Sequence, residues 1–425
     1  MVFAMNKSKM VNVRCPIFGF IKLDDQEREI INSPCFQRLR RIKQLSLTDM
    51  VYPSAVHTRF EHSLGVMQMA SDMFDVIAGK EGNMKKLGLN DNDKEKVRKI
   101  VRLAALLHDV GHSPFSHAGE DIMPLLPKNH IDFNPDSRKI QKFEHEHYSK
   151  MAVKVIFKDI IENHRDGLGG IKVDEVLYLL KDENVTKRYY LTVFKDLVSG
   201  QADADRADYL LRDSHHLGVS YGHYDKNRLI NCMTIGENDA GTPVLAIEEG
   251  GWQVAESLVL ARYNMFTSVY FHKTRRIYDY HIGEALKEVL KSEGLSDGAF
   301  WPPSENISDL NEYLKFDDWK VCGALSEGRG GKHGERILNR NHYKQKGKDW
   351  QGPLTEENQQ EIEDLRKKYG YEKSFVDKSV TTNWYKVNTD INIKENKTGI
   401  IIPLSKKSQI VKQIGRPEIT RFYAE

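Results

Sequence analysis

Two histidines and two aspartates in the first half of this 425-residue chain are of the types that bind a divalent metal ion. They are His62, the adjacent pair His108-Asp109, and Asp205. Asp is rarely buried without a partner or a metal, so an adjacent His-Asp pair favours a ligand role over a hydrogen-bonded core histidine. Nitrogen and oxygen ligands without a thiolate suit an octahedral ion such as Mn, Fe, Ni, Co or Mg. We therefore predict a divalent metal site.

Helices with one apolar face must position these residues. Apolar side chains recur at helical spacing over residues 97–107, directly before His108-Asp109, and Gly111 and Pro114 follow as stop signals. His62 begins a second such stripe that continues over residues 66–74. The pattern places the His-Asp pair at a helix end and turns His62 inward.

The third part of the predicted site lies in the acidic stretch 202–213. On a helix, Asp205, Tyr209 and Asp213 are four residues apart and share a face. A metal ligand, an aromatic ring and a second carboxylate would then line one wall of the predicted site. The spacing alone leaves open whether Asp203, Asp205 or Asp208 is the ligand, and a solvated acidic face is the alternative.

Further ionisable residues follow the His-Asp pair. His112, His117, Glu120 and His145 lie close to it in the sequence. Imidazoles beside a metal can protonate a leaving oxygen or, when charged, bind phosphate. The alternative for His112 and His117 is a loop held by local hydrogen bonds. We favour a catalytic role.

The composition excludes several classes of protein. A net charge of +2 does not favour a general nucleic-acid binder. No stretch approaches the roughly 20 apolar residues that span a bilayer, and residues 1–16 do not read as a secretion signal. The four cysteines are scattered without CxxC spacing, as expected for reduced thiols in a cytoplasmic protein.

The chain divides into three predicted parts and is mainly α-helical. Residues 1–55 form an extended segment followed by a helical stretch interrupted near Pro34. Residues 56–296 are helical, with a hairpin between Met233 and Glu248. Residues 297–425 form a smaller C-terminal α+β lobe, with a charged helix over 356–369 and strands over 391–404 and 418–423. Within this lobe, residues 327–352 are rich in Gly and Lys and are predicted to form a mobile loop.

Several short motifs appear in a fixed order along the chain. They are Phe36-Gln37-Arg38-Leu39-Arg40, Ile42-Lys43-Gln44-Leu45, Arg59-Phe60-Glu61-His62-Ser63-Leu64-Gly65-Val66, Leu107-His108-Asp109-Val110-Gly111-His112, Pro114-Phe115-Ser116-His117, the stretch Asp205 to Asp213, His215-His216-Leu217-Gly218 and Arg275-Arg276-Ile277-Tyr278. In these motifs the chain resembles the HD-domain metal phosphohydrolases, most closely the deoxynucleoside triphosphate triphosphohydrolases related to the SAM-and-HD-domain dNTPase. The resemblance runs from about Pro16 to Leu290.

The resemblance implies a helical HD-domain catalytic core that converts a dNTP to a deoxynucleoside and tripolyphosphate. It implies that the metal ligands are His62, His108, Asp109 and Asp205. Around the triphosphate it places Arg59, His112, His117 and His145, with His117 as the proton donor, and Glu120 in the place of a supporting Asp. For substrate binding it implies Gln44, Leu45, Arg206, Tyr209, Asp213 and Tyr278, and with poorer alignment Arg262 and Tyr270.

The resemblance also implies a regulatory and interface role for residues 1–55. The relatives are homo-oligomers, tetramers or dimers, that hold activating nucleotides at interfaces. This chain keeps Gln37 and Arg40 of the implied effector site. At the position where the relatives have a carboxylate that recognises guanine, it has Asn32. We therefore expect either no activator or a nucleotide effector other than GTP. An exposed basic helix face is the alternative.

Two other functions stay open at this point. One is another HD-family phosphodiesterase, acting on a cyclic nucleotide or guanosine tetraphosphate, for which the stretch 164–169 gives a faint signal. The other is a non-catalytic nucleotide or nucleic-acid binder. The complete ligand set favours the enzyme, because a binder does not need an open metal site.

Overall fold

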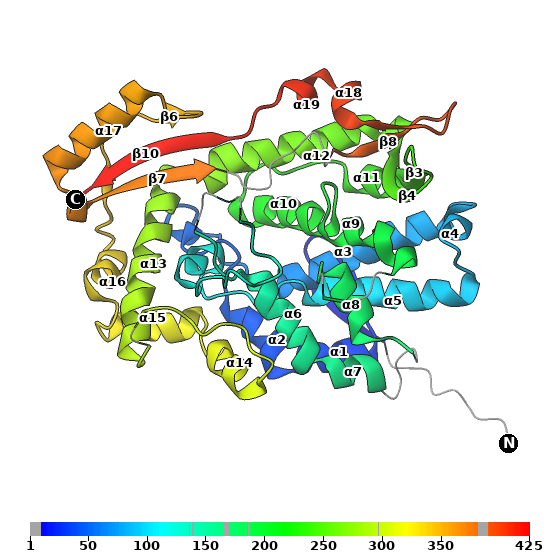
Figure 1. The fold of residues 1–425 in the computed structure, drawn as a ribbon, viewed down its shortest axis with the longest axis horizontal. Coiled ribbons are helices and arrows are strands. Elements are labelled where there is room, and N and C mark those ends of the chain that lie inside the picture. The colour runs from blue at the N-terminus through cyan, green and yellow to red at the C-terminus, as the bar shows by residue number, and fades with distance from the viewer. Residues whose placement is uncertain are drawn as a thin grey trace.

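The structure is a computed structural model that describes residues 10–135, 137, 140–164, 170–182, 184–185, 188–295, 297–380 and 390–425. Helices make up most of it, with one two-stranded and two four-stranded sheets among the described residues (Figure 1), so the predicted mainly α fold is confirmed. Residues 165–169, which carried the faint phosphodiesterase signal, lie outside the described residues. Among the described helices, none is both long and apolar enough to cross a membrane.

The N-terminal segment, which the sequence predicts as extended and then helical with a break near Pro34, forms a hairpin followed by a broken helix. Strands β1 (Val11–Cys15) and β2 (Gly19–Leu23) pair antiparallel. Helix α1 (Asp25–Asn32) begins with a capping box between Asp24 and Glu27. Ser33 ends α1 and caps α2 (Pro34–Gln37), which continues as the 3₁₀ turn Arg38–Arg41. The interruption falls at Pro34 because proline cannot continue the preceding helix.

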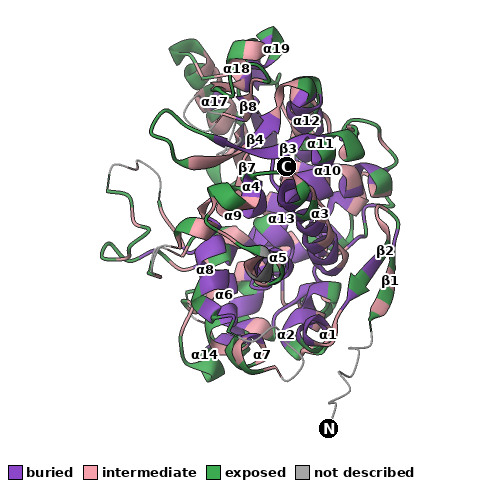
Figure 2. Ribbon diagram, turned by 90° about the vertical axis from the view of Figure 1, so that its right-hand side faces the viewer, coloured by how far each residue is buried: buried purple, intermediate pink, exposed green. Residues whose placement is uncertain are grey.

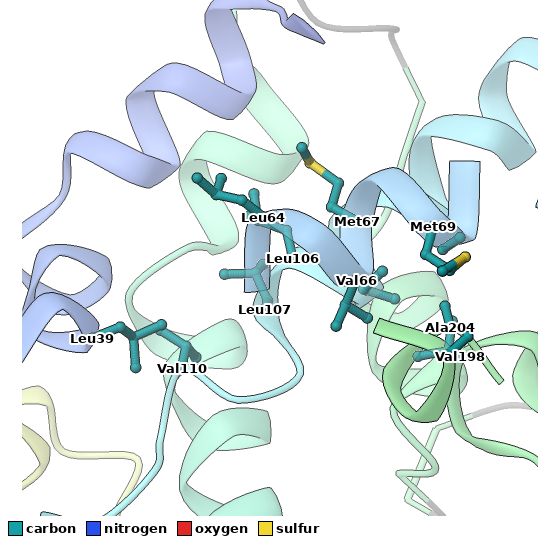
Figure 3. Packing of buried hydrophobic residues seen from close by; sticks show 14 of the residues in the cluster. Leu39, Leu64, Val66, Met67, Met69, Leu106, Leu107, Val110, Val198 and Ala204 are labelled. Carbon is teal, nitrogen blue, oxygen red and sulfur yellow. The ribbon is translucent and has the colours of Figure 1, made fainter. Parts of the chain in front are cut away.

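Three helices form the centre of the molecule. Helix α3 (Arg59–Gly79) packs against α5 (Asp91–Leu107) and α10 (Ala204–Leu217). Leu64 and Met67 of α3, Leu106 of α5 and Ala204 of α10 lie in this apolar core (Figure 3). Helix α3 is buried over most of its surface (Figure 2), as expected for a helix at the centre of a large core.

Close packing of α3 against α10 depends on Gly65. A Cβ atom at this position would lie 2.0 Å from Oδ1 of Asp208 and 2.1 Å from Nη2 of Arg212, both on α10. Only glycine therefore allows the first turns of α3 to approach the buried polar side chains of α10.

The remaining helices surround this centre. They are α4 (Asn83–Lys86), α6 (His145–Val155), α7 (Lys158–Asn163), α8 (Val173–Leu179), α9 (Thr192–Ser199), α11 (Lys226–Cys232), α12 (Trp252–Met265), α13 (Lys273–Ser292), α14 (Ile307–Leu314), α15 (Asp318–Ser326), α16 (Gly331–Leu338), α17 (Glu356–Tyr369), α18 (Leu404–Lys407) and α19 (Gln409–Gln413). A π-helical turn, Phe266–Tyr270, separates α12 from α13.

Each of the two four-stranded sheets joins segments that are far apart in the sequence. The predicted hairpin, β3 (Met233–Glu237) and β4 (Pro243–Glu248), is extended by β8 (Asn392–Lys394), parallel to β4, and by β9 (Ile401–Pro403). In the second sheet, β10 (Glu418–Ala424) pairs along its length with β7 (Ser374–Val380) (Figure 1). The short strands β5 (Lys344–Gln345) and β6 (Trp350–Gln351) also pair with β10.

Two features differ from the sequence prediction for the C-terminal region. The segment 327–352 is not one mobile loop, because it contains α16, β5 and β6. Gly330 allows close packing, because a Cβ atom at this position would lie 2.2 Å from Leu325 of α15. In addition, one hydrophobic cluster contains residues from Cys15 to Ile419 and crosses the predicted boundaries at 55/56 and 296/297, while a small separate cluster forms around Trp350, Ile362 and Phe422.

Candidate active site

The ends of three central helices bring the predicted metal ligands together. His62 lies in the first turn of α3, His108 and Asp109 directly follow α5, and Asp205 lies in the first turn of α10. Nε2 of His62 is 3.1 Å from Oδ1 of Asp205 and 3.8 Å from Oδ2 of Asp109. Nε2 of His108 is 3.4 Å from Oδ1 of Asp109 and 3.8 Å from Oδ1 of Asp205. Two nitrogens and two carboxylates thus face one point.

The two imidazoles are oriented as metal ligands usually are. Within the described part of the chain, Nε2 of His62 and Nε2 of His108 are buried and have no hydrogen-bond partner of regular geometry. Their other nitrogens are held: Nδ1 of His62 by Asp208 at 2.8 Å, and Nδ1 of His108 by the carbonyl oxygen of Ala105 at 2.8 Å. Such a partner on the far nitrogen fixes the tautomer and turns the lone pair toward the metal. The residues present therefore fit a divalent ion.

Only one of the three acidic candidates on α10 faces these nitrogens. Asp203 is the N-cap of α10 and accepts from the backbone N–H of Arg206 at 2.7 Å. Asp208 is fully buried and holds both His62 and the guanidinium of Arg212. Asp205 is left as the carboxylate beside the ligand nitrogens.

Electrostatics in this cluster favour bound positive charge. Burial opposes protonation of His62, but the carboxylates of Asp205 and Asp208 raise its pKa to about 10. Burial also disfavours the charged form of Asp109, yet Arg59 and the surrounding histidines hold its pKa well below the usual range. Both carboxylates facing the centre are therefore ionised at neutral pH. A divalent cation can replace the proton on His62 as their partner.

Arg59 contacts one of the predicted metal ligands. Its buried guanidinium forms a salt bridge with Asp109, and its Nε donates to Oγ of Ser116 at 2.9 Å. Arg59 therefore links a ligand carboxylate to the loop that carries His112 and His117.

His112, His117, Glu120 and His145 form a second cluster next to the first. Glu120 accepts from Nδ1 of His117 at 2.9 Å and from Nδ1 of His145 at 2.5 Å. Nε2 of His145 lies 3.5 Å from Oδ1 of Asp109, which connects the two clusters. The side chain of His117 is 62% exposed, so it can reach a bound molecule, whereas His112 is fully buried.

The second cluster is better suited to proton transfer and anion binding than to a second metal. Its four side chains are close enough to hold an ion. However, the rings of His112 and His145 stack at 4.0 Å and 14°, so their nitrogen lone pairs lie in nearly parallel planes and do not converge. Despite burial, Glu146 and Glu120 raise the pKa of His145 to about 10, so this imidazole is positively charged at neutral pH. Burial and the charge of Arg59 keep the pKa of His112 well below its usual value.

Several predicted substrate residues gather around a histidine that the sequence analysis did not select. The buried carboxylate of Asp213 pairs with Nε2 of His57 at 2.8 Å and accepts from the hydroxyl of Tyr270 at 2.6 Å. The ring of Tyr209 lies 6.2 Å from that of Tyr270, edge to face. The backbone N–H of Gln44 donates to the carbonyl oxygen of His57. Tyr270 belongs to the π-helical turn, a feature often found at functional sites.

Other predicted substrate residues have structural partners. Arg206 pairs with Asp203 and with the carbonyl oxygen of Gly200. Arg262 is buried and its guanidinium lies 5.6 Å from the ring of Phe266. The remaining two are Leu45, which is buried, and Tyr278, which is fully buried with its ring 4.9 Å from that of His342.

Of the predicted effector residues, Asn32 lines a surface cavity, whereas Arg40 contacts Gln37 and Phe60. Nε of Arg40 donates to Gln37 at 2.9 Å, and the guanidinium of Arg40 lies 3.5 Å from the ring of Phe60. Asn32 lines a surface cavity of about 560 Å³ together with charged side chains of α1 and with Ile160. Neither Gln37 nor Arg40 is part of that lining.

A helical core that gathers His, His-Asp and Asp at three helix ends defines the class of protein. The sequence matches the HD domain over residues 59–212 and the HD associated region over residues 224–416. The chain belongs to the HD-domain phosphohydrolases, as the sequence resemblance indicated.

Among curated relatives, an uncharacterized protein of Methanocaldococcus jannaschii is 34% identical over 332 residues, which cover 78% of this chain and 58% of that protein. Deoxynucleoside triphosphate triphosphohydrolase SAMHD1 of Homo sapiens is 29% identical over 316 residues, covering 71% of this chain and 49% of that protein. The matched region is thus about half of the length of these relatives.

Among solved structures, a hypothetical protein from Aquifex aeolicus has a TM-score of 0.74 at 27% identity and covers 98% of this chain and 96% of its own. A phosphohydrolase from Bacteroides thetaiotaomicron has a TM-score of 0.73 at 25% identity and covers 98% of this chain and 100% of its own. The fold is therefore shared over nearly the whole chain.

Proposed function

We propose that the protein is a metal-dependent dNTP triphosphohydrolase, which converts a dNTP to a deoxynucleoside and tripolyphosphate. The observation that carries the proposal is the pair of buried Nε2 atoms on His62 and His108, which face two carboxylates without a hydrogen bond. The likeness to relatives named as deoxynucleoside triphosphate triphosphohydrolases supports the choice of substrate.

His62, His108, Asp109 and Asp205 would hold one divalent ion, drawn from Mn, Fe, Ni, Co and Mg. Such an ion lowers the pKa of water and offsets negative charge on phosphate oxygens. Asp208 and the carbonyl oxygen of Ala105 keep the two imidazoles turned toward it.

In this proposal His117 protonates the departing 5′-oxygen of the nucleoside. Its exposed ring is held through Nδ1 by Glu120, which leaves Nε2 free to donate a proton. The charged ring of His145 and the guanidinium of Arg59 both lie next to Asp109 and would bind the triphosphate. His112, which stacks on His145, keeps that ring in place.

The deoxyribose would bind where Asp213, Tyr209 and Tyr270 gather near Gln44, with Leu45 and Tyr278 closing the wall. An apolar wall rejects an added hydroxyl by only about 1–3 kcal/mol. Ribonucleotides are therefore expected to be poor substrates rather than inert, and Tyr278→Ala should narrow the ratio of dATP to ATP hydrolysis. An unchanged ratio of dATP to ATP hydrolysis in Tyr278→Ala would place the sugar elsewhere.

Arg206 and Arg262 would contribute positive charge near the phosphates.

Product analysis tests the reaction type. The metal-loaded protein is incubated with each dNTP and NTP, and the products are separated by chromatography. Nucleoside with intact tripolyphosphate is the expected result. A monophosphate with pyrophosphate would contradict the proposed reaction. Hydrolysis of cyclic nucleotides or guanosine tetraphosphate instead would point to another HD-family phosphodiesterase. Binding without turnover would point to a nucleotide-binding protein.

Replacing the proton donor tests its role. His117→Ala should lower kcat by ~10²–10⁴-fold with unchanged metal content, because general acid catalysis contributes about that much. The exposed His223, changed to Ala, is a control that should keep the wild-type rate. An unaffected kcat in His117→Ala would reject this assignment.

We also propose a homo-oligomer whose effector, if it has one, is not specific for guanine. The amide of Asn32 offers one acceptor oxygen and one NH₂ donor where a carboxylate offers two acceptor oxygens, so it should not discriminate strongly for guanine. Light scattering and rate measurements with each nucleotide test the proposal. A fully active monomer, or strict GTP activation that Asn32→Ala abolishes, would contradict it.

A further inference from the structure

The loop of residues 111–117, which carries His112 and His117 and is called the His117 loop below, has an unfavourable backbone conformation. Phe115 and Ser116, two consecutive residues with side chains, have φ values of 57° and 55°. Left-handed conformations cost free energy outside glycine and persist only where the surroundings hold them. His117 is the next residue, so whatever holds this turn also sets the position of its imidazole.

A carboxylate from outside the HD domain holds the turn. Asp318, in the first turn of α15, is 3% exposed. Its Oδ1 accepts from the backbone N–H of Phe115 at 2.7 Å, and its Oδ2 accepts from the backbone N–H of Lys43 at 2.8 Å. One side chain therefore ties the His117 loop to the segment that continues into Gln44 and Leu45.

These contacts continue as far as the metal ligands. Oγ of Ser116 donates to the carbonyl oxygen of Lys43 at 2.7 Å and accepts from Nε of Arg59 at 2.9 Å. Arg59 in turn pairs with Asp109. A chain of hydrogen bonds thus connects Asp318 with a ligand carboxylate.

The same corner of the C-terminal region contacts the start of the loop. The hydroxyl of Tyr313 in α14 donates to the carbonyl oxygen of Gly111 at 2.8 Å. The buried guanidinium of Arg38 bridges the carbonyl oxygens of Phe316 and His112, at 2.8 and 2.7 Å. Residues 313–318 therefore hold the loop both at its start and at Phe115.

We infer that Asp318 is a positioning residue. It fixes the His117 loop against residues 43–45, so that the proposed proton donor His117 keeps its position relative to the proposed substrate residues Gln44 and Leu45. The inference rests on the proposed function for its catalytic consequence, but the contacts themselves do not depend on the substrate.

Hydrogen exchange tests the contacts directly. Asp318→Asn keeps the shape of the side chain but offers one acceptor oxygen instead of two, so one backbone N–H loses its partner. Exchange in segments 42–45 and 113–117 should become faster, on the order of 10–100-fold. Asp317→Asn is the matched control, because Asp317 instead caps α15 and pairs with Arg41.

Kinetics with two leaving groups test the positioning role. In Asp318→Asn, kcat for the dNTP should fall by roughly 10²-fold, with KM and metal content little changed, because small misplacement of a catalytic group is costly. Hydrolysis of bis(p-nitrophenyl) phosphate should fall much less, since p-nitrophenolate departs without a proton. If Asp318→Asn does not fold, Asp318→Ser, which keeps a hydroxyl acceptor, replaces it.

Unchanged exchange in both segments, or equal acceleration in Asp317→Asn, would overturn the inference. An equal loss of rate on both substrates would also overturn it, because that result indicates general damage to the site. Failure of the proposed function is seen separately, as wild-type protein that releases no tripolyphosphate, and the exchange measurements still decide the role of Asp318 in that case.

Discussion

Asp208→Asn should weaken metal binding although Asp208 is not one of the predicted ligands. Asp208 is fully buried, and its Oδ2 lies 2.8 Å from Nδ1 of His62 and 2.8 Å from Nε of Arg212. Its Oδ1 accepts from Nη2 of Arg212 at 2.8 Å. The substitution keeps the shape of the side chain and removes the charge that both partners use.

Two separate effects follow from this geometry. Losing the partner that orients a ligand histidine typically costs 10–100-fold in metal affinity, about 1.4–2.7 kcal/mol. Arg212 also loses its charge partner, and the nearest remaining acceptors are Glu61 at 3.4 Å and the sulfur of Cys15 at 3.6 Å. Breaking a buried pair in this way costs about 3–5 kcal/mol of unfolding free energy.

A double variant separates these effects. Arg212→Met added to Asp208→Asn removes the unpaired cation, so the unfolding free energy should largely recover while metal affinity stays low. Metal affinity is measured by calorimetric titration of the metal-free protein, and stability by urea unfolding. Asp225→Asn, at the exposed N-cap of α11, is the control and should change neither.

Two results would refute the reasoning. Wild-type metal affinity in Asp208→Asn would show that Asp208 does not orient His62. Recovery of metal affinity in the double variant would show that the charge of Arg212, and not the orientation of the imidazole, had caused the loss.

Three other predictions follow from the same structure. Gly65→Ala should lower the unfolding free energy by about 1–3 kcal/mol, because the added Cβ atom would overlap Asp208 and Arg212. Gly79→Ala on the same helix has open space around the added Cβ atom and should not destabilise the protein. Equal unfolding curves for the two variants would contradict this prediction. Burial lowers the pKa of His281 from 6.5 to about 3, so the unfolded chain binds a proton that the native state excludes. Stability should therefore fall as the pH drops from about 6.5 toward 3, by up to ~1.4 kcal/mol per unit, with a flatter profile in His281→Gln; parallel profiles would refute the assignment. Chelation should abolish hydrolysis and return of a divalent ion should restore it, and activity that persists in chelator would reject the metal site.

The sequence predicted the helices with strong periodicity well, because burial of one face decides their structure. The charged helix over 356–369 has the same bounds as α17, and the hairpin between Met233 and Glu248 forms as β3 and β4. The stretch 327–352 was misread because its glycines, typical of loops, here allow α16 to pack closely on α15. Local composition does not distinguish these two uses of glycine.

The candidate site was predictable only as far as its motifs. Spacing selected His62 and the His-Asp pair, but left Asp203, Asp205 and Asp208 equivalent. The distinction depends on which face of α10 packs against α3, and this is set by Gly65 at a distance in the sequence. Nothing in the sequence connects Asp318 with Phe115, because the two residues meet only when the C-terminal region folds back.

The sheet that joins β4 to β8 has a consequence for biosynthesis. All the predicted metal ligands leave the ribosome well before β8 and β10, yet these strands complete the two four-stranded sheets, and the later helix α15 holds the His117 loop. Until then, the nascent chain exposes apolar side chains and the unpaired edge of β4, which are typical starting points for aggregation. The active site should therefore mature late, and substitutions in β8 should reduce the yield of folded protein more than the specific activity of the molecules that do fold.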